Sequence, residues 1–563
     1  MTSLVKRKSK HLVERNYRLL LGPVLRAATV KGRCSSETIP IPAFALRLLL
    51  LLNCTSSLLH AALVLPGTQP TEGGIEFGKV AQCILCHSGT KNGLADPYSS
   101  WHGTMMGQAA RDPIFRAGLA IANQDVKGVG EFCIRCHAPR GWLAGRSEVT
   151  DGSGLNREDL HGVSCEICHH LVDPLSAEAK ELVKKVPPGY GNGMMVADPE
   201  NVSRGPFADS KGAMPHRTIK SAYQSSSELC ANCHNVSNPL QAQDVNVQAP
   251  HAFGHIERTY SEWVLSDFAR PESLRTCQSC HFARVPSGGQ ASRYGELHRD
   301  YFVSHAATGG STWVQDAILK IWSGKEGKDI DPDALKAVQQ QAREFLKTSA
   351  ALGLEIGTGT AQLTITNLTG HKLPTGYPEG RRMWVNVRFL DQAGQLLGEV
   401  GRYREKEETI GGEPVKVPTL LDSEKTRVYE CVPGISSAQA EKFKRAPGAS
   451  FHFILNDITV KDNRIPPRGF KNAAFAGHLC APVGTRYEDG QFWDTVEFAV
   501  PQGTQQVEAR LMYQSISWEY IKFLREENRT DKWGQQLYEA WEKTGRCLPE
   551  VIASISKPVN RGR

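Results

Sequence analysis

CILCH, from Cys83 to His87, is the first of five copies of one pattern, Cys-x-x-Cys-His, between residues 83 and 281. The other four copies read CIRCH, CEICH, CANCH and CQSCH. This spacing is the attachment signature of a c-type haem: two thiols form thioethers with the haem, and the next residue places an imidazole on the iron. The sequence therefore predicts five covalently bound haem c groups. The predicted attachment residues are Cys83, Cys86, Cys133, Cys136, Cys165, Cys168, Cys230, Cys233, Cys277 and Cys280, and the predicted proximal ligands are His87, His137, His169, His234 and His281.

Zinc is the alternative for these motifs, because two Cys-x-x-Cys units can bind one zinc ion through four thiolates. The number of units is odd and a histidine follows each one, which favours haem. Five further cysteines lie outside the motifs. Two of them, Cys431 and Cys480, fall in one later segment, where a disulfide between them is an open alternative.

The N-terminal segment explains the basic charge of the chain. The formal net charge is +7, and residues 1–40 alone hold nine Lys or Arg against two Glu. The rest of the chain is close to neutral, so the charge gives no support for nucleic-acid binding. The basic stretch continues into the apolar run 43–66, which reads as an export signal. Arg47, Asn53 and His60 interrupt this run and make an uncleaved membrane anchor the weaker alternative. Export to the periplasm or the cell exterior also suits covalent haem attachment.

Little helical or strand periodicity is visible between residues 70 and 310, where Gly, Pro, Asn and Ser are frequent. We expect haem groups to supply much of the core in this part of the chain. A short helix is expected at 256–270, where apolar and aromatic residues recur at helical spacing. A second helical segment is expected at 312–350, with Asp331 as N-cap and Pro332 as first helical residue.

The pattern then changes to alternating β-branched and aromatic residues with turn signals such as Ala393-Gly394. The expected strands lie within 361–367, 381–391, 395–403, 426–432, 450–460 and 506–514. Helical spacing returns at 517–543. The predicted fold class is α+β and multidomain: an irregular, mostly helical and loop pentahaem domain, then a β-sandwich and a C-terminal helix. The predicted units are a leader (1–66), the pentahaem cytochrome domain (67–312), a helical connector (313–352), the β-sandwich (353–515) and a helical tail (516–563).

The supply of spare histidines bears on function. An iron with only its motif histidine is open to ligands, whereas a second imidazole closes it and suits it to electron transfer. The chain has 18 histidines, of which five are in motifs and two in the leader, so the supply exceeds the five needed.

The segments WHGTMMGQAARDPIF (101–115) and GHKLPTGYPEGRRMW (370–384) resemble exported multihaem cytochromes of the cytochrome c-554/c-552 type. NRIPPRGF (463–470) and YQSISWEYIKFL (513–524) resemble the C-terminal module attached to many of them. The resemblance implies that His102, His216, His305 and His371 are distal ligands, with His161 or His170 as a fifth.

The residues themselves bear on these assignments. Met105 and Met106 offer a thioether as an alternative to His102, although packing is the more ordinary role. His170 directly follows His169 and cannot reach the same iron, but a neighbouring iron is within reason. His371 lies between a glycine and a Pro-Thr-Gly turn, so its direction is constrained. If it reaches a haem, the β-sandwich must be docked against the cytochrome domain.

Two classes of function follow. The leading hypothesis is an electron carrier that exchanges electrons with other redox proteins or quinol-linked membrane complexes, with no nucleic-acid partner. The rival is a multihaem enzyme with one open iron, acting on a small nitrogen or sulfur species. A haem-bearing structural subunit of a larger assembly is a third interpretation.

Overall fold

The computed structural model describes residues 65–559 apart from 208–215, 239–254, 295–297 and 325–326. These residues belong to one compact unit, His60–Arg563. The predicted leader lies almost wholly outside the described residues, as does His251. Within the described residues no helix is both long and apolar enough to cross a membrane.

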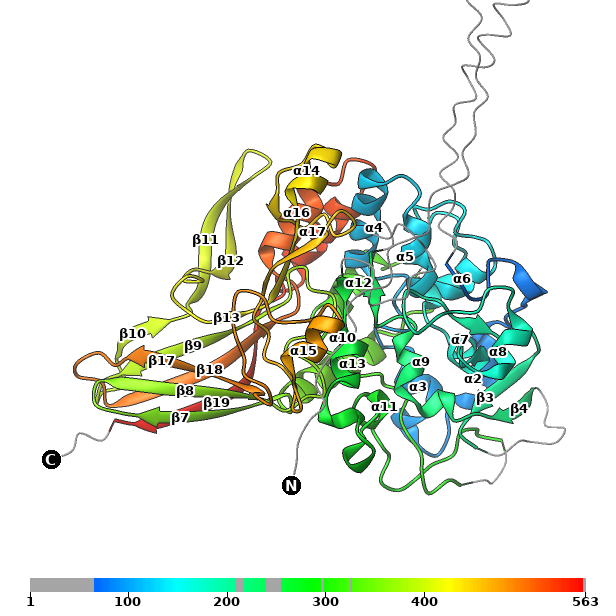
Figure 1. Cartoon of the computed structure of the whole chain (residues 1–563), viewed down its shortest axis with the longest axis horizontal. Coiled ribbons are helices and arrows are strands. Elements are labelled where there is room, and N and C mark those ends of the chain that lie inside the picture. Colours follow the sequence, from blue (N-terminus) through cyan, green and yellow to red (C-terminus); the bar gives the residue numbers. More distant parts are fainter. Residues whose placement is uncertain (1–64, 208–215, 239–254, 295–297, 325–326, 560–563) are drawn as a thin grey trace, which may run out of the picture. The chain divides into compact units, whose positions relative to one another are not determined.

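Short helices and two-to-four-residue strands make up the motif region, which we define as residues 65–312 (Figure 1). Four of the five Cys-x-x-Cys-His copies lie in helices that end at or next to the motif histidine; α9 ends just after the first cysteine of the fourth copy. A helical turn puts positions i, i+3 and i+4 on one face, so both thiols and the imidazole face the same way. The helices are α2 (Val80–His87), α3 (Pro97–Trp101), α4 (Pro113–Asp125), α5 (Gly130–His137), α6 (Pro139–Leu143), α7 (Cys165–His170), α8 (Ala177–Leu182), α9 (Ser227–Ala231), α10 (Thr259–Val264) and α11 (Cys277–His281).

Three small sheets join distant parts of the motif region. They pair β1 (Leu171–Val172) with β2 (Val196–Ala197), β3 (Val202–Gly205) with β4 (Arg217–Lys220), and β5 (Val236–Ser237) with β6 (His255–Glu257). The helix expected at 256–270 is shorter than predicted: only α10 is α-helical, and 3₁₀ turns follow it. A modest apolar cluster does form between α4, α5 and α6, around the fully buried Trp142.

The connector contains α12 (Val314–Ile321) and α13 (Pro332–Leu346). The predicted start of α13 is confirmed, since the Asp331 carboxylate accepts hydrogen bonds from the backbone N–H groups of Asp333 and Ala334, and Pro332 is the first helical residue.

Two sheets pack over a shared apolar core in the β region, residues 350–558 (Figure 1). One sheet has the order β17-β8-β7 and the other β10-β9-β18-β19, with β13 on β9. The strands are β7 (Ala350–Ile356), β8 (Thr360–Asn367), β9 (Arg382–Leu390), β10 (Leu396–Val400), β13 (Val428–Tyr429), β17 (Trp493–Ala499), β18 (Gln506–Gln514) and β19 (Glu550–Pro558). The α+β fold class is thereby confirmed.

Smaller elements complete the β region. The hairpin β11 (Tyr403–Ile410) with β12 (Glu413–Leu420) and the sheet β15 (Gly448–Ala449), β14 (Cys431–Ile435) and β16 (Ile458–Asp462) flank the main sheets. The short helices are α14 (Ser437–Phe443) and α15 (Asn472–Gly477), and α16 (Trp518–Glu526) and α17 (Trp533–Lys543) follow β18.

Three details differ from the sequence expectations. Residues 450–457 form no strand; Ile454 and Leu455 are buried in a cluster that includes the end of α4. The tail is not purely helical, because β19 returns to pair with β18 along its whole length. No disulfide joins Cys431 to Cys480 in the described chain; both side chains are buried.

Candidate haem-binding site

A cavity of about 2180 Å³ lies at the centre of the motif region. Small-molecule sites usually measure about 300–1,000 Å³, so this volume suits several large groups. All ten motif cysteines and all five motif histidines line it. Four further histidines reach the same cavity: His170, His216, His305 and His371.

Three of these additional imidazoles face a motif imidazole across the cavity. His216 faces His87, His305 faces His169 and His371 faces His281, and each pair of ring centroids is 6.3 Å apart with the planes within 26° of parallel. A metal binds imidazole nitrogen at about 2 Å and that nitrogen lies about 1 Å from the ring centre, so two imidazoles on opposite sides of one ion are about 6 Å apart. The three pairs therefore fit the axial ligation of three haem irons.

Hydrogen bonds fix which nitrogen of three motif imidazoles faces the cavity. In His87, Nδ1 lies 2.5 Å from the carbonyl oxygen of Ala291. In His169 the same nitrogen lies 2.6 Å from the carbonyl oxygen of Arg204, and in His281 it lies 2.5 Å from that of Thr308. Nδ1 must then carry the proton and donate it. This leaves the lone pair on Nε2, as an axial ligand requires.

Burial favours the neutral form of five of the imidazoles in these pairs. It lowers the pKa of His281 and that of His305 to about 4, and the pKa values of His169, His216 and His371 are lowered for the same primary reason. A neutral ring is the form that binds a metal.

The other two motif histidines have different surroundings. Within the described chain, no imidazole faces His137 or His234 at the spacing of the three pairs. The Phe115 ring stacks on His137 with centroids 4.0 Å apart, and burial lowers the pKa of His137 to about 4. Burial also disfavours the charged form of His234, but the Glu257 carboxylate, 3.0 Å from its Nδ1, outweighs this and raises the pKa to about 9.

His102 and His161 do not line the cavity, unlike the other sequence-derived candidates. His102 Nε2 lies 3.4 Å from Asp331 and its Nδ1 lies 3.2 Å from the carbonyl oxygen of Tyr98. His161 Nε2 lies 3.4 Å from Asp329. Both imidazoles are thus held by carboxylates next to the start of α13, where the structure does not bring them near a motif histidine.

His170 occupies an intermediate position. It is buried, lines the cavity and has its Nδ1 3.1 Å from the carbonyl oxygen of Asp198. Its described ring neighbour is Phe77, at 5.5 Å, rather than a motif imidazole. Met105 and Met106 also line the cavity.

The motif cysteines fall into neighbouring groups. Cys83 of the first motif lies close enough to Cys165 of the third to lower the pKa of the Cys83 thiol. In the same way the fourth motif contacts two others, through Cys233 with Cys136 and through Cys230 with Cys277. In the described residues no three His, Cys, Asp or Glu side chains gather as a single metal site.

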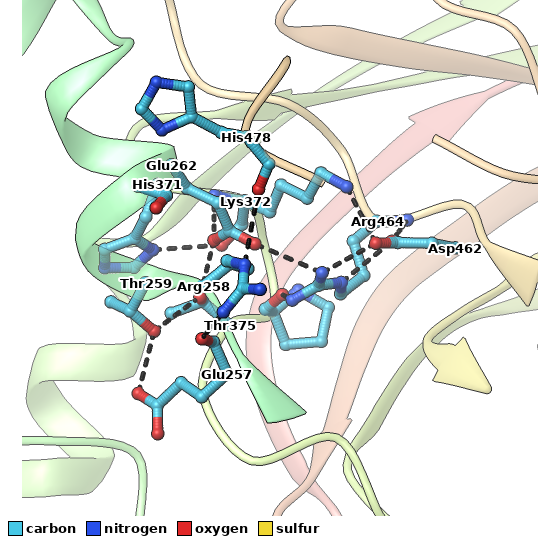
Figure 2. A network of polar contacts seen from close by, with 12 residues as sticks. Glu257, Arg258, Thr259, Glu262, His371, Lys372, Thr375, Asp462, Arg464 and His478 are labelled. Carbon is cyan, nitrogen blue, oxygen red and sulfur yellow. Dashed lines mark hydrogen bonds and ion pairs between the residues drawn. The ribbon is translucent and has the colours of Figure 1, made fainter. Parts of the chain in front are cut away.

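A buried polar network holds the loop that contains His371 against the motif region (Figure 2). His371 lies on the loop between β8 and β9, and its Nδ1 lies 2.9 Å from the carbonyl oxygen of Lys372. The Lys372 backbone N–H and the Thr375 hydroxyl both donate to Glu262 of α10, at 3.1 and 2.6 Å. The β region is therefore bonded directly to the motif region at the point where His371 enters the cavity.

Four buried charges support this contact (Figure 2). Asp462 accepts from the Lys372 ammonium and the Arg464 guanidinium, each at 2.7 Å, and Arg464 also pairs with Glu262 at 3.1 Å. Two cations and two anions give no net charge, which makes their burial tolerable. The sequence analysis did not single out Glu257, Glu262 or this charge cluster. The position of Lys372 directly after His371 was the available signal.

Comparison with known proteins agrees with this site. The family model "Cytochrome c554 and c-prime" matches residues 82–170, which include three of the five motifs. No curated protein matches the chain. A solved penta-heme cytochrome c552 from Thermochromatium tepidum is similar in structure, with a TM-score of 0.49 and 17% identity over 85% of this chain and 98% of that one. The family match supports the resemblance stated from the motifs: residues 82–170 of this chain are similar to the cytochrome c554 family.

Proposed function

We propose that the chain binds five haem c groups and transfers electrons as an exported cytochrome. The observation that carries the proposal is the cavity lined by ten motif thiols and five motif imidazoles, three of them facing a second imidazole at 6.3 Å. When bound, haem supplies reversible one-electron redox chemistry.

The residues of this chain have distinct tasks in that proposal. The motif thiols fix each group covalently, and backbone carbonyls orient the proximal imidazoles. At three of the five sites a second imidazole would hold the haem from the opposite side, which would exclude water and substrates from the iron and favour rapid electron exchange over bond chemistry. The natural partners that we propose are other redox proteins or quinol-linked membrane complexes. Cys280 is the exposed one of the ten motif thiols, so a partner would approach the fifth site most readily.

A reductive titration tests the proposal. The chain, produced in a host that attaches haem c and exports proteins, should take up five electrons reversibly, and its intact mass should equal the polypeptide plus five haems. The double variant C277A/C280A should lose one haem and one electron. A protein that carries zinc and no haem would overturn the proposal.

One observation favours a second candidate, an enzyme with an open iron. His137 has no facing imidazole in the described chain, and its cavity is also lined by Asp112, Tyr377 and Arg381. Burial raises the pKa of Asp112 to about 6, so this carboxyl can exchange protons near neutral pH. These residues offer a proton donor and a cation to a small nitrogen or sulfur species. Addition of nitrite or hydroxylamine to the oxidised protein should then perturb one haem spectrum; spectra that do not respond would remove this candidate.

A further inference from the structure

The proximal imidazole of His234 differs from those of His87, His169 and His281 in what its outer nitrogen contacts. Nδ1 of His87, His169 and His281 lies against a neutral backbone carbonyl. Nδ1 of His234 instead lies 3.0 Å from Oε1 of the Glu257 carboxylate. A hydrogen bond to an ionised acceptor is about twice as strong as a neutral one. It draws the proton away from the ring and makes the opposite nitrogen a stronger electron donor to a metal.

The fold holds Glu257 in this position through backbone and side-chain contacts. Strand β6 ends at Glu257, which pairs in register with Val236 of β5, two residues after His234. The Tyr260 N–H donates to the carbonyl oxygen of His234 at 3.0 Å, which fixes the start of α10 against the motif. The Glu257 side chain is 14% exposed and lines the cavity.

Thr259 sets the orientation of the carboxylate (Figure 2). Its hydroxyl donates to Oε1 of Glu257 at 3.0 Å, the same oxygen that faces His234. Two donors thus share one oxygen, and each weakens the charge available to the other. Removing the Thr259 donor should therefore strengthen the contact between Glu257 and His234.

The fourth motif also lies close to three of the other four motifs. Its cysteines contact Cys136 of the second motif and Cys277 of the fifth. Cys168 of the third motif lies close enough to influence both Cys230 and Cys233 electrostatically. A change in the properties of the group held by His234 therefore affects the neighbours on several sides.

We propose that Glu257 is a positioning residue that gives His234 imidazolate character and thereby lowers the reduction potential of the haem held at the fourth motif. The proposal rests on the proposed haem-binding function and adds the control of one potential to it. A more electron-rich axial ligand stabilises ferric iron over ferrous iron, so the expected sign is a lower potential.

The test is a spectroelectrochemical titration of the full-length holoprotein and three variants. Glu257→Gln keeps the shape and an oxygen acceptor but removes the charge, and it should raise one of the five midpoint potentials. Thr259→Val should shift the same potential in the opposite direction. Glu228→Gln is the matched control: Glu228 lies in the helix of the same motif and accepts from Tyr260 at 3.3 Å, without contacting His234. It should cause a clearly smaller shift.

The outcomes distinguish a failure of this proposal from a failure of the proposed haem-binding function. Haem content is measured first, and a wild-type chain without five haems contradicts the proposed function instead of the role of Glu257. With five haems present, equal shifts in Glu257→Gln and Glu228→Gln, or no shift in either, overturn the proposal. If Glu257→Gln loses its fourth haem, Thr259→Val decides: a fall in one potential supports the proposal, and unchanged potentials refute it.

Discussion

The β region and the motif region are stabilised in opposite ways. In the β region, Leu363, Ile365, Val385 and Leu511 are fully buried between two sheets, so side chains alone fill the core. In the motif region, the chain surrounds a cavity of about 2180 Å³ lined by nine histidines and ten cysteines. The structure of the β region can be predicted from its apolar periodicity, whereas that of the motif region is indicated by its cysteine and histidine motifs.

The two regions meet at His371. This residue belongs to the β region, yet its imidazole faces His281 of the fifth motif. The buried charges around Lys372 and Glu262 hold it there. The β region is thus part of the proposed haem-binding site, although it contains no Cys-x-x-Cys-His motif.

The largest effect on the difference between the two regions is expected when haem attachment is prevented. In a host that lacks the attachment machinery, we expect the motif region to lose its order, because a cavity of this size without its apolar filling is strongly destabilising. Limited proteolysis with mass spectrometry should then yield a resistant fragment that contains residues 350–558. Equal digestion of both regions would show that the β region has no independent stability.

The next largest effect is expected from Asp462→Asn. This change removes the carboxylate that pairs with the Lys372 ammonium and leaves Arg464 with Glu262 as its anionic partner in the charge cluster. Breaking a buried pair costs about 3–5 kcal/mol. Chemical denaturation should report this loss in the free energy of unfolding. Asp422→Asn, which removes the surface pair with Arg402, is the control and should change stability by less than about 1 kcal/mol.

Asp462 should also make the docking contact acid-sensitive. Burial alone would raise the pKa of this carboxyl, but Arg464 and Lys372 hold it well below its ordinary value. A carboxyl with a lowered folded pKa contributes stability that is complete above its unfolded pKa and is lost as the pH falls through the folded value. The wild type should therefore lose stability at low pH, and Asp462→Asn should lose less over the same acid range.

Glu379 should give the free energy of unfolding the opposite pH dependence. This carboxyl is buried, and burial raises its pKa to about 8. The folded protein then binds a proton that the unfolded chain releases, so stability falls as the pH rises from the unfolded pKa to about 8, by at most about 1.4 kcal/mol per pH unit. Glu379→Gln should reduce this slope in denaturation curves from pH 5 to 9. The exposed Glu542→Gln serves as the control, and an identical slope in both variants would argue against a buried protonated Glu379.

The smallest effect is expected at the start of α13. Asp331→Ala removes an N-cap and should lower the free energy of unfolding by about 1 kcal/mol. Asp333→Ala, which leaves the N-cap side chain in place, is the control. Asp331 also lies 3.4 Å from Nε2 of His102, which does not line the cavity. The haem spectra of Asp331→Ala should remain those of the wild type; a change in spin state would indicate that His102 is a ligand after all.

The features that could be predicted best from the sequence are those that depend on residues close to one another along the chain. The five motifs, the Asp331 cap and most strands of the two main sheets follow from local spacing and periodicity. His371 could be singled out because a short turn constrains it. His102 and His161 could not be separated from true cavity residues, because their placement depends on Asp331 and Asp329, which are far away in the sequence.

Two further features depend on distant parts of the chain. Strand β19 pairs with β18, although two helices separate the two strands in the sequence. Glu257 meets His234 because β6 pairs with β5, and an isolated glutamate gives no sign of such a contact. Tertiary pairing, rather than local preference, decides both.

Low-temperature EPR of the oxidised His371→Ala variant tests most directly whether the β region completes an iron site in the motif region. We predict that one low-spin ferric signal disappears and that a high-spin signal of one haem per chain replaces it, relative to the wild type. His298→Ala, which removes an exposed imidazole that contacts the Ser287 carbonyl oxygen, should leave the spectrum unchanged. Identical spectra for His371→Ala and the wild type, at five haems per chain, would contradict the account.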